Sequence, residues 1–286
     1  MSQTSQSITP ELRAWIVEQA SAGHSSDSVL EAMKASGWHE DTALVAMEEV
    51  MLAHVGQINA PAHEGSFPTA GLPMIETAAG NTLWAYDRAI RVLASLAHPR
   101  LVVLANVVSD EECATLMASA SERLDRSQTV VHETGGSEVN VARTSDGMFF
   151  SRGETEVIER IEKRLAALTQ WPIENGEGLQ ILRYLPGAEY KPHFDYFDPA
   201  QPGTAAVLRR GGQRLATLVI YLNAPERGGA TIFPDAGVSV HPVAGHAVFF
   251  SYALPDPTTK TLHGGAPVEA GEKWVATKWM RAGRFE

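Results

Sequence analysis

From Gly178 to Arg281 the chain is a series of short segments rich in β-branched and aromatic residues, and Gly, Pro and Asn separate one segment from the next. Segments of this kind predict strands joined by turns. Strands that follow one another through tight turns pair antiparallel. We therefore predict an antiparallel jelly roll with supporting helices, which is an α+β fold.

An early part of this region, LRYLPGAEYKPHFDYF (182–197), carries His193 and Asp195. The aromatic residues around the pair favour a strand, in which residues i and i+2 point to the same face. One imidazole and one carboxylate on one face supply two ligands of a 2-His-1-carboxylate triad, which leaves positions open on Fe(II). The segment therefore predicts part of a metal site.

The same spacing occurs in His39-Glu40-Asp41, where we expect a different structure. This copy lies at the start of a predicted helix, in which residues i and i+2 point about 200° apart and cannot share a small ion. We interpret it as an N-terminal turn with acidic residues near the positive end of the helix dipole. The pair alone is thus weak evidence, and the rest of the chain must support the metal site.

A later segment, TLHGGAPVEAGEKWVATKWMR (261–281), supplies the remaining groups. His263 is the candidate third ligand, and Lys273 follows ten residues later in a strand-like alternating pattern. A lysine there is either an outward, solvated residue or a fixed cation for the far carboxylate of a metal-bound 2-oxo acid. Three other residues are weaker candidates because of their loop or strand-entry positions: His241 and His246 as metal ligands, and Lys260 as the cation.

Several features in this order resemble the prolyl 4-hydroxylase-like 2-oxoglutarate/Fe(II) dioxygenases: RYLPGAEYKPHFDYF (183–197), GGQR (211–214), RLATLVIYLN (214–223), GGATIFP (228–234), and the spacing of His263 and Lys273. The resemblance begins near HPRLVVLANVVSDEEC (98–113), continues through VARTSDGMFF (141–150), and covers roughly the C-terminal two thirds of the chain. It implies a double-stranded β-helix that uses Fe(II), 2-oxoglutarate and O2, and it raises the use of ascorbate as a reductant.

The resemblance also implies roles at matching positions. The implied metal ligands are His193, Asp195 and His263, and the implied 2-oxoglutarate contacts are Lys273, Tyr184 and Thr231. The implied contacts to a prolyl substrate are Tyr190, Arg214, Trp279 and Arg143. From pattern alone, the tyrosines, the tryptophan and the threonine also suit ordinary strand or core positions, and Arg143 suits a surface ion pair.

The chain departs from the family pattern at two positions. Ala230 stands where the family often has an acidic residue, and a small side chain there should keep the turn. Arg281 stands at a position that varies among relatives, and this leaves the identity of the substrate open.

We therefore expect a hydroxylase that converts 2-oxoglutarate to succinate and CO2 while it hydroxylates a peptidyl proline in an extended segment. One alternative keeps this chemistry and changes the substrate to a free or carrier-bound amino acid. Another is a non-catalytic binding protein in which the N-terminal part does the work. Retention of all three candidate ligands and the cation argues against the last alternative.

Composition limits the partners and the compartment. A formal net charge of −11 argues against broad binding to nucleic acid or to an anionic membrane. The single cysteine, Cys113, excludes an internal disulfide and favours a reducing compartment. Residues 1–20 lack a basic start followed by an apolar core, and no apolar run approaches the length that crosses a bilayer. We expect a cytoplasmic protein whose partner is a proline-containing peptide or protein.

The N-terminal residues predict a small three-helix bundle, weakly similar to a ubiquitin-associated-type bundle. Thr9 and either Ser25 or Ser26 are candidate N-caps. We expect the bundle either to pack on the catalytic domain or self-associate, or to dock a peptide or partner. The predicted organisation is a bundle, an Ala-, Gly-, Pro- and Thr-rich linker, and a dioxygenase domain: 1–56, 57–82 and 83–286.

Ahead of the jelly roll we predict four elements: a helix at 83–96, a strand at 99–108, and helices near 109–124 and 154–168. By analogy with the family, residues 130–141 are interpreted as a mobile loop near the mouth of the site. The Gly-rich run 201–214 is interpreted as a lid.

Overall fold

The computed structural model describes residues 8–21, 24–58, 71–130, 137–139 and 144–286. The chain divides into two compact units. The helical unit comprises residues 1–72 with 253–259, and the β unit comprises residues 73–252 with 260–286. The domain boundaries predicted at residues 56 and 82 stay a prediction.

Three helices form the helical unit: α1 (Pro10–Ser21), α2 (Ser26–Ala35) and α3 (Glu40–Ile58). The Thr9 hydroxyl accepts a hydrogen bond from the Leu12 amide, and the Ser25 hydroxyl accepts one from the Ser28 amide, so both caps begin their helices. The helices share one apolar core: Ile16, Val29, Leu30, Met33, Ala43, Leu44, Ala46, Met47 and Val50. The predicted bundle is confirmed, and the acidic pair after His39 lies in the first turn of α3 as predicted.

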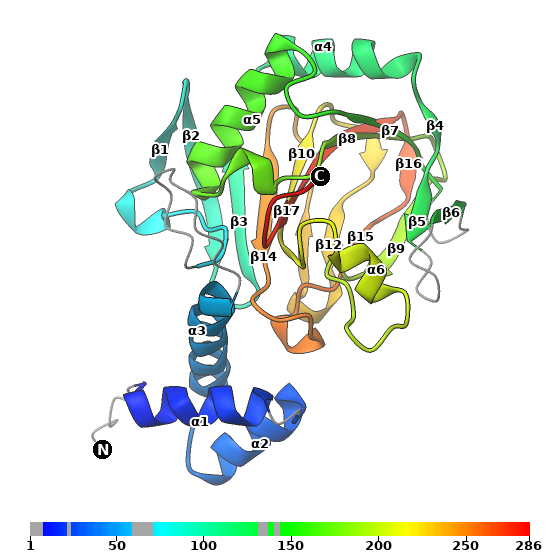
Figure 1. The fold of residues 1–286 in the computed structure, drawn as a ribbon. Helices are drawn as coiled ribbons and strands as arrows, with labels where there is room; N and C mark the ends of the chain where they lie inside the picture. The colour runs from blue at the N-terminus through cyan, green and yellow to red at the C-terminus, as the bar shows by residue number, and fades with distance from the viewer. Residues whose placement is uncertain (1–7, 22–23, 59–70, 131–136, 140–143) are drawn as a thin grey trace. The chain divides into compact units, whose positions relative to one another are not determined.

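A nine-stranded antiparallel sheet is the framework of the β unit (Figure 1). Its strands are, in spatial order, β1 (Thr82–Ala85), β2 (Arg88–Leu96), β3 (Arg100–Ala105), β14 (Ala247–Ser251), β10 (Arg214–Tyr221), β17 (Lys273–Arg281), β8 (Leu179–Tyr184), β7 (Asp146–Phe150) and β4 (Asp125–Arg126). Strand β17 is buried along its whole length. Both faces of the sheet are therefore covered at this strand.

A second antiparallel sheet contains four strands in the order β13 (Val238–Val240), β12 (Thr231–Phe233), β15 (His263–Gly265) and β9 (Tyr190–His193). The two sheets share one core, in which Leu182, Phe250 and Val275 of the large sheet join Phe233 and Val240 of the small sheet. The predicted jelly roll is confirmed. Two short antiparallel pairs complete the strands: β11 (Arg227–Gly228) with β16 (Val268–Ala270), and β5 (Gln128–Val130) with β6 (Ser137–Val139).

Two helices support the large sheet: α4 (Asp110–Ser121) and α5 (Glu156–Thr169). Buried ion pairs attach α5 to its surroundings. The Arg164 guanidinium binds the carboxylates of Asp87 and Glu112, and Glu162 Oε1 lies 2.6 Å from Lys278 Nζ of β17. The helices predicted near 109–124 and 154–168 are confirmed.

The helix predicted at 83–96 is wrong, because this segment forms the β1–β2 hairpin. Its Ala, Leu and Arg residues have a high helix propensity. However, Tyr86 adopts a left-handed conformation at the turn, with φ of 57°, and β2 pairs with the strand predicted at 99–108, which forms as β3. Pairing within the sheet outweighs the local preference.

Some predicted segments lie partly outside the described residues. Of the linker predicted at 57–82, residues 59–70 are not described, and the loop predicted at 130–141 is described only within β5 and β6. The lid predicted at 201–214 contains α6 (Thr204–Leu208), and its movement stays a prediction. Four short 3-10 helices occur in the described ranges: Thr77–Ala79, Ile173–Asn175, Pro234–Ala236 and Pro257–Thr259. Among the described helices, none combines the length and apolar character that a bilayer span requires.

Candidate metal centre

Strands β9 and β15 place two histidines close together. His193 and His263 are partners in the antiparallel ladder, and opposed residues of a ladder present their side chains on one face. Their ring centroids lie 4.4 Å apart. Gly264 permits the close pairing, because a Cβ atom there would lie 2.8 Å from the carbonyl oxygen of Tyr190.

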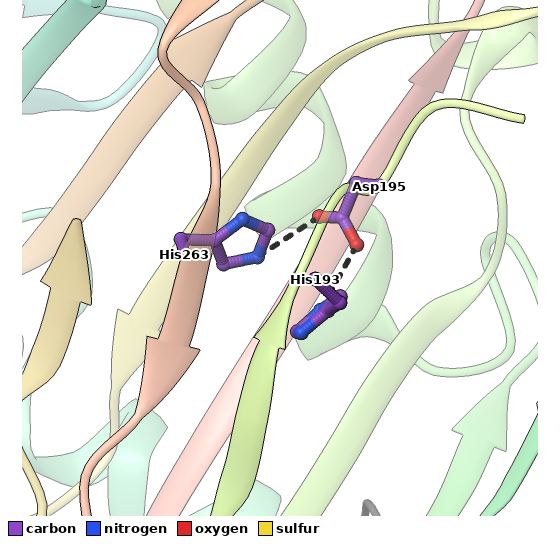
Figure 2. Close-up of side chains that lie close together, drawn as sticks. All are labelled: His193, Asp195 and His263. Carbon is purple, nitrogen blue, oxygen red and sulfur yellow. Dashed lines mark ion pairs between the residues drawn. The ribbon is translucent and has the colours of Figure 1, made fainter. Parts of the chain in front are cut away.

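Asp195 completes the cluster from the segment after β9. Its carboxylate faces both imidazoles, and an ion pair joins it to each of them (Figure 2). Oδ1 lies 3.5 Å from His193 Nε2, and Oδ2 lies 3.5 Å from His263 Nε2. The ligand atoms of the three residues all lie within 4.8 Å of one another. The structure therefore brings the three predicted ligands together.

Backbone carbonyls orient both imidazoles. His193 Nδ1 lies 2.9 Å from the carbonyl oxygen of Lys191, and His263 Nδ1 lies 3.0 Å from that of Thr261. A carbonyl only accepts hydrogen bonds, so each Nδ1 carries the proton and donates it. When the imidazole is neutral, its Nε2 has a free lone pair on the side of Asp195, which is the tautomer that a metal ligand requires.

Burial and charge set the protonation of the cluster. Burial lowers the pKa of His263 to about 4, so this imidazole is neutral at pH 7. Burial opposes ionisation of Asp195, but the neighbouring histidines and Arg214 outweigh it and hold its pKa well below the usual range. At neutral pH the cluster therefore offers the neutral imidazole of His263 and the carboxylate of Asp195 as ligands.

Two buried hydroxyls hold the Asp195 carboxylate. Thr217 Oγ1, on β10, donates to Asp195 Oδ2 at 2.7 Å. The Tyr252 hydroxyl lies 3.1 Å from Thr217 Oγ1 and must be the donor, because the single Thr217 proton goes to the carboxylate. Both residues are buried. Neither residue was predicted from the sequence, since only packing in the fold brings Thr217 to Asp195 and Tyr252 to Thr217.

This donor set fits Fe(II). Two imidazole nitrogens and one carboxylate oxygen are the 2-His-1-carboxylate ligand set, which leaves further coordination positions for other ligands. The hydrogen bonds to both imidazoles and to the carboxylate are the outer contacts that orient ligands in metal sites. His193, Asp195 and His263 could therefore hold the ion without rearrangement of the strands that carry them.

A small inner cavity, with a volume of about 50 Å³, adjoins the cluster. Alternate residues of β17 face it, namely Lys273, Val275, Thr277 and Trp279, as the period of a strand requires. Tyr184 and Thr231 also line it, so the structure brings all three predicted 2-oxoglutarate contacts to one cavity. The Thr231 hydroxyl accepts a hydrogen bond from the Tyr221 hydroxyl at 2.8 Å.

Lys273 is a buried cation in this cavity. Its side chain is nearly inaccessible, and its ammonium lies 5.4 Å and 5.7 Å from the ring centroids of Tyr184 and Tyr221. Burial lowers the pKa of Lys273 to about 8, so most of the ammonium stays charged at pH 7. Within the described part of the chain, no carboxylate forms an ion pair with it. An anionic ligand in the inner cavity would supply the missing counter-charge.

A larger outer cleft, with a volume of about 930 Å³, meets the inner cavity at the metal ligands. Four residues line both: Tyr190, His193, Asp195 and Trp279. The Tyr190 ring stacks on His193 with centroids 3.7 Å apart. Aromatic side chains also form part of the wall, among them Phe149, Phe194, Tyr196, Phe197 and Phe285.

Trp279, which lines both spaces, packs against Arg214 of the outer cleft. The guanidinium of Arg214 lies 4.0 Å from the Trp279 ring centroid and forms two hydrogen bonds with Glu177, at 2.7 and 3.0 Å. The indole N–H of Trp279 is buried and has no hydrogen-bond acceptor among the described residues. Glu177 was not predicted, because nothing in its local sequence distinguishes it.

The other residues singled out from the sequence lie elsewhere. His241, His246 and Lys260 line neither cavity. Arg143 lies outside the described residues. Arg281 is 1% exposed and donates to carbonyl oxygens at the end of α6, those of Val207 and Arg210. Ala230 is buried beside Thr231.

An antiparallel jelly roll that carries two histidines, one carboxylate and a buried lysine in the adjoining cavity defines a mononuclear non-haem iron oxygenase. Comparison with known proteins specifies the family. The family model of the 2OG-Fe(II) oxygenase superfamily matches residues 179–281. Prolyl 4-hydroxylase 5 of Arabidopsis thaliana is 38% identical over 233 residues, which cover 74% of this chain and 77% of that protein.

Prolyl 4-hydroxylase 1 of the same plant is 45% identical over 202 residues, covering 64% of this chain and 69% of that protein. A solved structure of a viral collagen prolyl hydroxylase from Paramecium bursaria Chlorella virus-1 in complex with 2-oxoglutarate is 33% identical, with a TM-score of 0.48, and the match covers 63% of this chain and 95% of that one. The chain belongs to the prolyl 4-hydroxylase-like family of 2-oxoglutarate/Fe(II) oxygenases. It is a 2-oxoglutarate-dependent dioxygenase, and the family implies Fe(II), 2-oxoglutarate and O2.

Proposed function

We propose that this enzyme hydroxylates a prolyl residue within an extended peptide segment. The observation that carries the proposal is the junction of two cavities of very different size at one metal site. The inner cavity, of about 50 Å³, suits a small cosubstrate, whereas the outer cleft, of about 930 Å³, suits a polypeptide segment. The relatives named prolyl 4-hydroxylases support proline as the target.

The inner cavity would bind 2-oxoglutarate through its distal carboxylate. Lys273 would neutralise that carboxylate by a charge-assisted hydrogen bond, with Tyr184 and Thr231 at the same wall. The remaining wall is largely apolar, formed by residues such as Leu182, Val219 and Val275. These side chains leave little room for water beside the cosubstrate.

His193, Asp195 and His263 would hold Fe(II), each with the ligand atom that the structure directs toward the centre of the cluster. When bound, Fe(II) supplies the oxidising chemistry, in which one atom of O2 enters a substrate C–H bond and the other enters the succinate that forms from 2-oxoglutarate with release of CO2. The protein contributes orientation. The carbonyls of Lys191 and Thr261 fix the imidazoles, and Thr217 fixes the carboxylate.

The outer cleft would hold the peptide. The Trp279 indole N–H, buried without an acceptor among the described residues, would donate to a substrate carbonyl. Aromatic walls suit the flat faces of proline rings in an extended, polyproline-like segment. A free amino acid would fill only a small part of this space, so the cleft favours a peptide over that alternative.

Three further expectations belong to the proposal. Ascorbate serves as an accessory reductant, the enzyme is cytoplasmic, and the helical unit either docks a partner or self-associates. The first is supported by the family resemblance, and the second by the single cysteine. The third is supported only by the compact core of the helical unit.

The test is to incubate the purified protein with Fe(II), 2-oxoglutarate and ¹⁸O2 in the presence of proline-containing peptides. We expect the peptide to gain the mass of one labelled oxygen atom on proline, in proportion to the succinate released. The same peptides with alanine in place of proline are the matched control. Incorporation into a free amino acid but into no peptide would contradict the proposal.

A further inference from the structure

We propose that the outer cleft selects proline-containing peptide segments with acidic residues beside the target proline. The proposal rests on the proposed function above and adds the charge of the substrate. Five arginines line the cleft: Arg126, Arg152, Arg210, Arg214 and Arg281. This concentration of positive charge stands in contrast to the chain as a whole, whose formal net charge is −11.

Only one side-chain carboxylate pairs with these arginines in the described part of the chain. Glu177 binds Arg214 through two hydrogen bonds and lies 3.5 Å from Arg281 Nη1. A single carboxylate cannot neutralise two guanidinium groups. Arg126 and Arg152 form no ion pair with any described acidic side chain, so no described carboxylate neutralises them.

Main-chain oxygens hold two of the remaining arginines in place. Arg152 Nη1 donates to the carbonyls of Glu174 and Gly176, which carry no formal charge. Arg210 Nε donates at 2.7 Å to the terminal main-chain oxygen of Glu286, so Arg210 is not counted among the arginines without a counter-charge. Each guanidinium has five N–H donors, so donors remain for a carboxylate. The cleft thus presents fixed positive groups.

The acidic residues of the cleft leave part of this charge without a counter-charge. The lining acids are Asp125, Glu177, Asp195 and Glu286. Glu177 is bound to Arg214, Asp195 faces the imidazoles of the metal cluster, and Glu286 lies 2.5 Å from Arg284. Among the described acids that line the cleft, Asp125 is the one left to offset Arg126, its neighbour on the exposed strand β4. A peptide with negative charges near its proline therefore complements the cleft.

Arg126 is the best single position to test. It is exposed on β4, it lines the cleft, and its guanidinium forms no hydrogen bond or ion pair with the described residues. Its replacement should therefore leave the fold intact. Arg227 is the matched control, because it is 70% exposed at its side chain, pairs with Glu269 at the surface, and lines neither cavity.

The experiment uses the full chain with Fe(II), 2-oxoglutarate and three peptides of equal length, in which a central proline is flanked by Glu, Gln or Lys. The readout is kcat/KM for proline hydroxylation by mass spectrometry. We expect the order Glu, Gln, Lys, with each step worth up to about fivefold, the upper limit for an exposed charge pair. The preference should shrink as salt is raised, because exposed charges are screened.

Arg126→Glu should reduce the ratio between the Glu and Lys peptides, whereas Arg227→Glu, with the same change in net charge, should preserve the wild-type ratio. Equal rates for all three peptides, or an Arg126→Glu variant that keeps the full ratio, would overturn the charge proposal and leave proline hydroxylation intact. Hydroxylation of no peptide would instead contradict the proposed function.

Discussion

Strand β17 carries two buried lysines five positions apart, one on each of its two faces. Lys273 and Lys278 are each 4% exposed. Lys278 faces α5, where its ammonium lies 2.6 Å from Glu162 Oε1 and donates to the carbonyl of Glu177. Lys273 faces the inner cavity, where no described carboxylate pairs with it. The difference separates a charge that the fold itself neutralises from a charge that a ligand must neutralise.

Substitutions on the cavity-facing side of the sheet should lower enzyme activity far more than they lower stability. His263→Ala, beside that face, should lower succinate formation by more than about 100-fold, because even residues that only orient a metal ligand contribute about 10- to 100-fold. Retention of Fe(II) or Mn(II), measured by equilibrium dialysis, should fall with it. A variant that folds and turns over 2-oxoglutarate at the wild-type rate would exclude His263 as a ligand.

On the helix-facing side, Lys278→Met should destabilise the fold by about 3–5 kcal/mol, since it leaves the buried Glu162 carboxylate without its partner. Urea unfolding measures this change. The affinity of the folded variant for 2-oxoglutarate should equal that of the wild type. A lower affinity without loss of stability would reverse the assignment of the two faces.

The matched change on the cavity side is Lys273→Met. We expect 2-oxoglutarate binding to weaken by about 2–4 kcal/mol, because the distal carboxylate loses its cation. Calorimetry on the Mn(II)-loaded, oxygen-free protein measures the affinity. The free energy of unfolding should stay constant or increase, since a buried ammonium without a carboxylate is removed. Unchanged affinity would refute the role given to Lys273.

Thr217→Val should weaken metal binding by about 10- to 100-fold, because it removes the hydrogen bond that holds Asp195. Thr217→Ser keeps the hydroxyl and should restore most of the affinity. Dialysis against Mn(II) measures the affinity of each variant. Both variants alter the packing but only the valine variant lacks the hydroxyl, so a difference between them reports the positioning role. Equal affinity in the valine and serine variants would show that the hydroxyl is not required.

The pH dependence of cosubstrate binding should be the smallest effect when it is counted per pH unit. Burial lowers the pKa of Lys273 to about 8, so raising the pH above this value deprotonates the ammonium before 2-oxoglutarate binds. Affinity should therefore be nearly constant below pH 8 and fall above it by up to about tenfold per pH unit. Lys273→Arg should remove this dependence, because arginine stays protonated. A wild-type affinity for 2-oxoglutarate that is constant to pH 10 would contradict this role of the Lys273 ammonium.

Features with a local sequence signal could be predicted, whereas features set by packing between distant segments could not. Strand alternation and the spacing of His193, Asp195, His263 and Lys273 pointed to a jelly roll and its metal site, because these signals are local or repeated in a known family. The helix predicted at 83–96 failed because pairing with β3 outweighs local propensity. Thr217 is 22 positions from Asp195, and only the packing of strands reveals that the two residues touch.

Neither lysine of β17 could be assigned its environment from its own sequence. Period-2 alternation places Lys273 and Lys278 on opposite faces, but it does not say which face meets a helix and which meets a cavity. The family resemblance selected Lys273, and Glu162 on α5 shows why the other lysine is structural.

The segment 253–260 joins two residues that orient the metal ligands. At one end, the Tyr252 hydroxyl supports Thr217 and through it Asp195. At the other end, the carbonyl of Thr261 fixes His263. A change in the length or conformation of this connection would shift the supports of two ligands together. Insertions that connecting segments commonly tolerate should therefore be costly here, because they would disturb two of the three metal ligands at once.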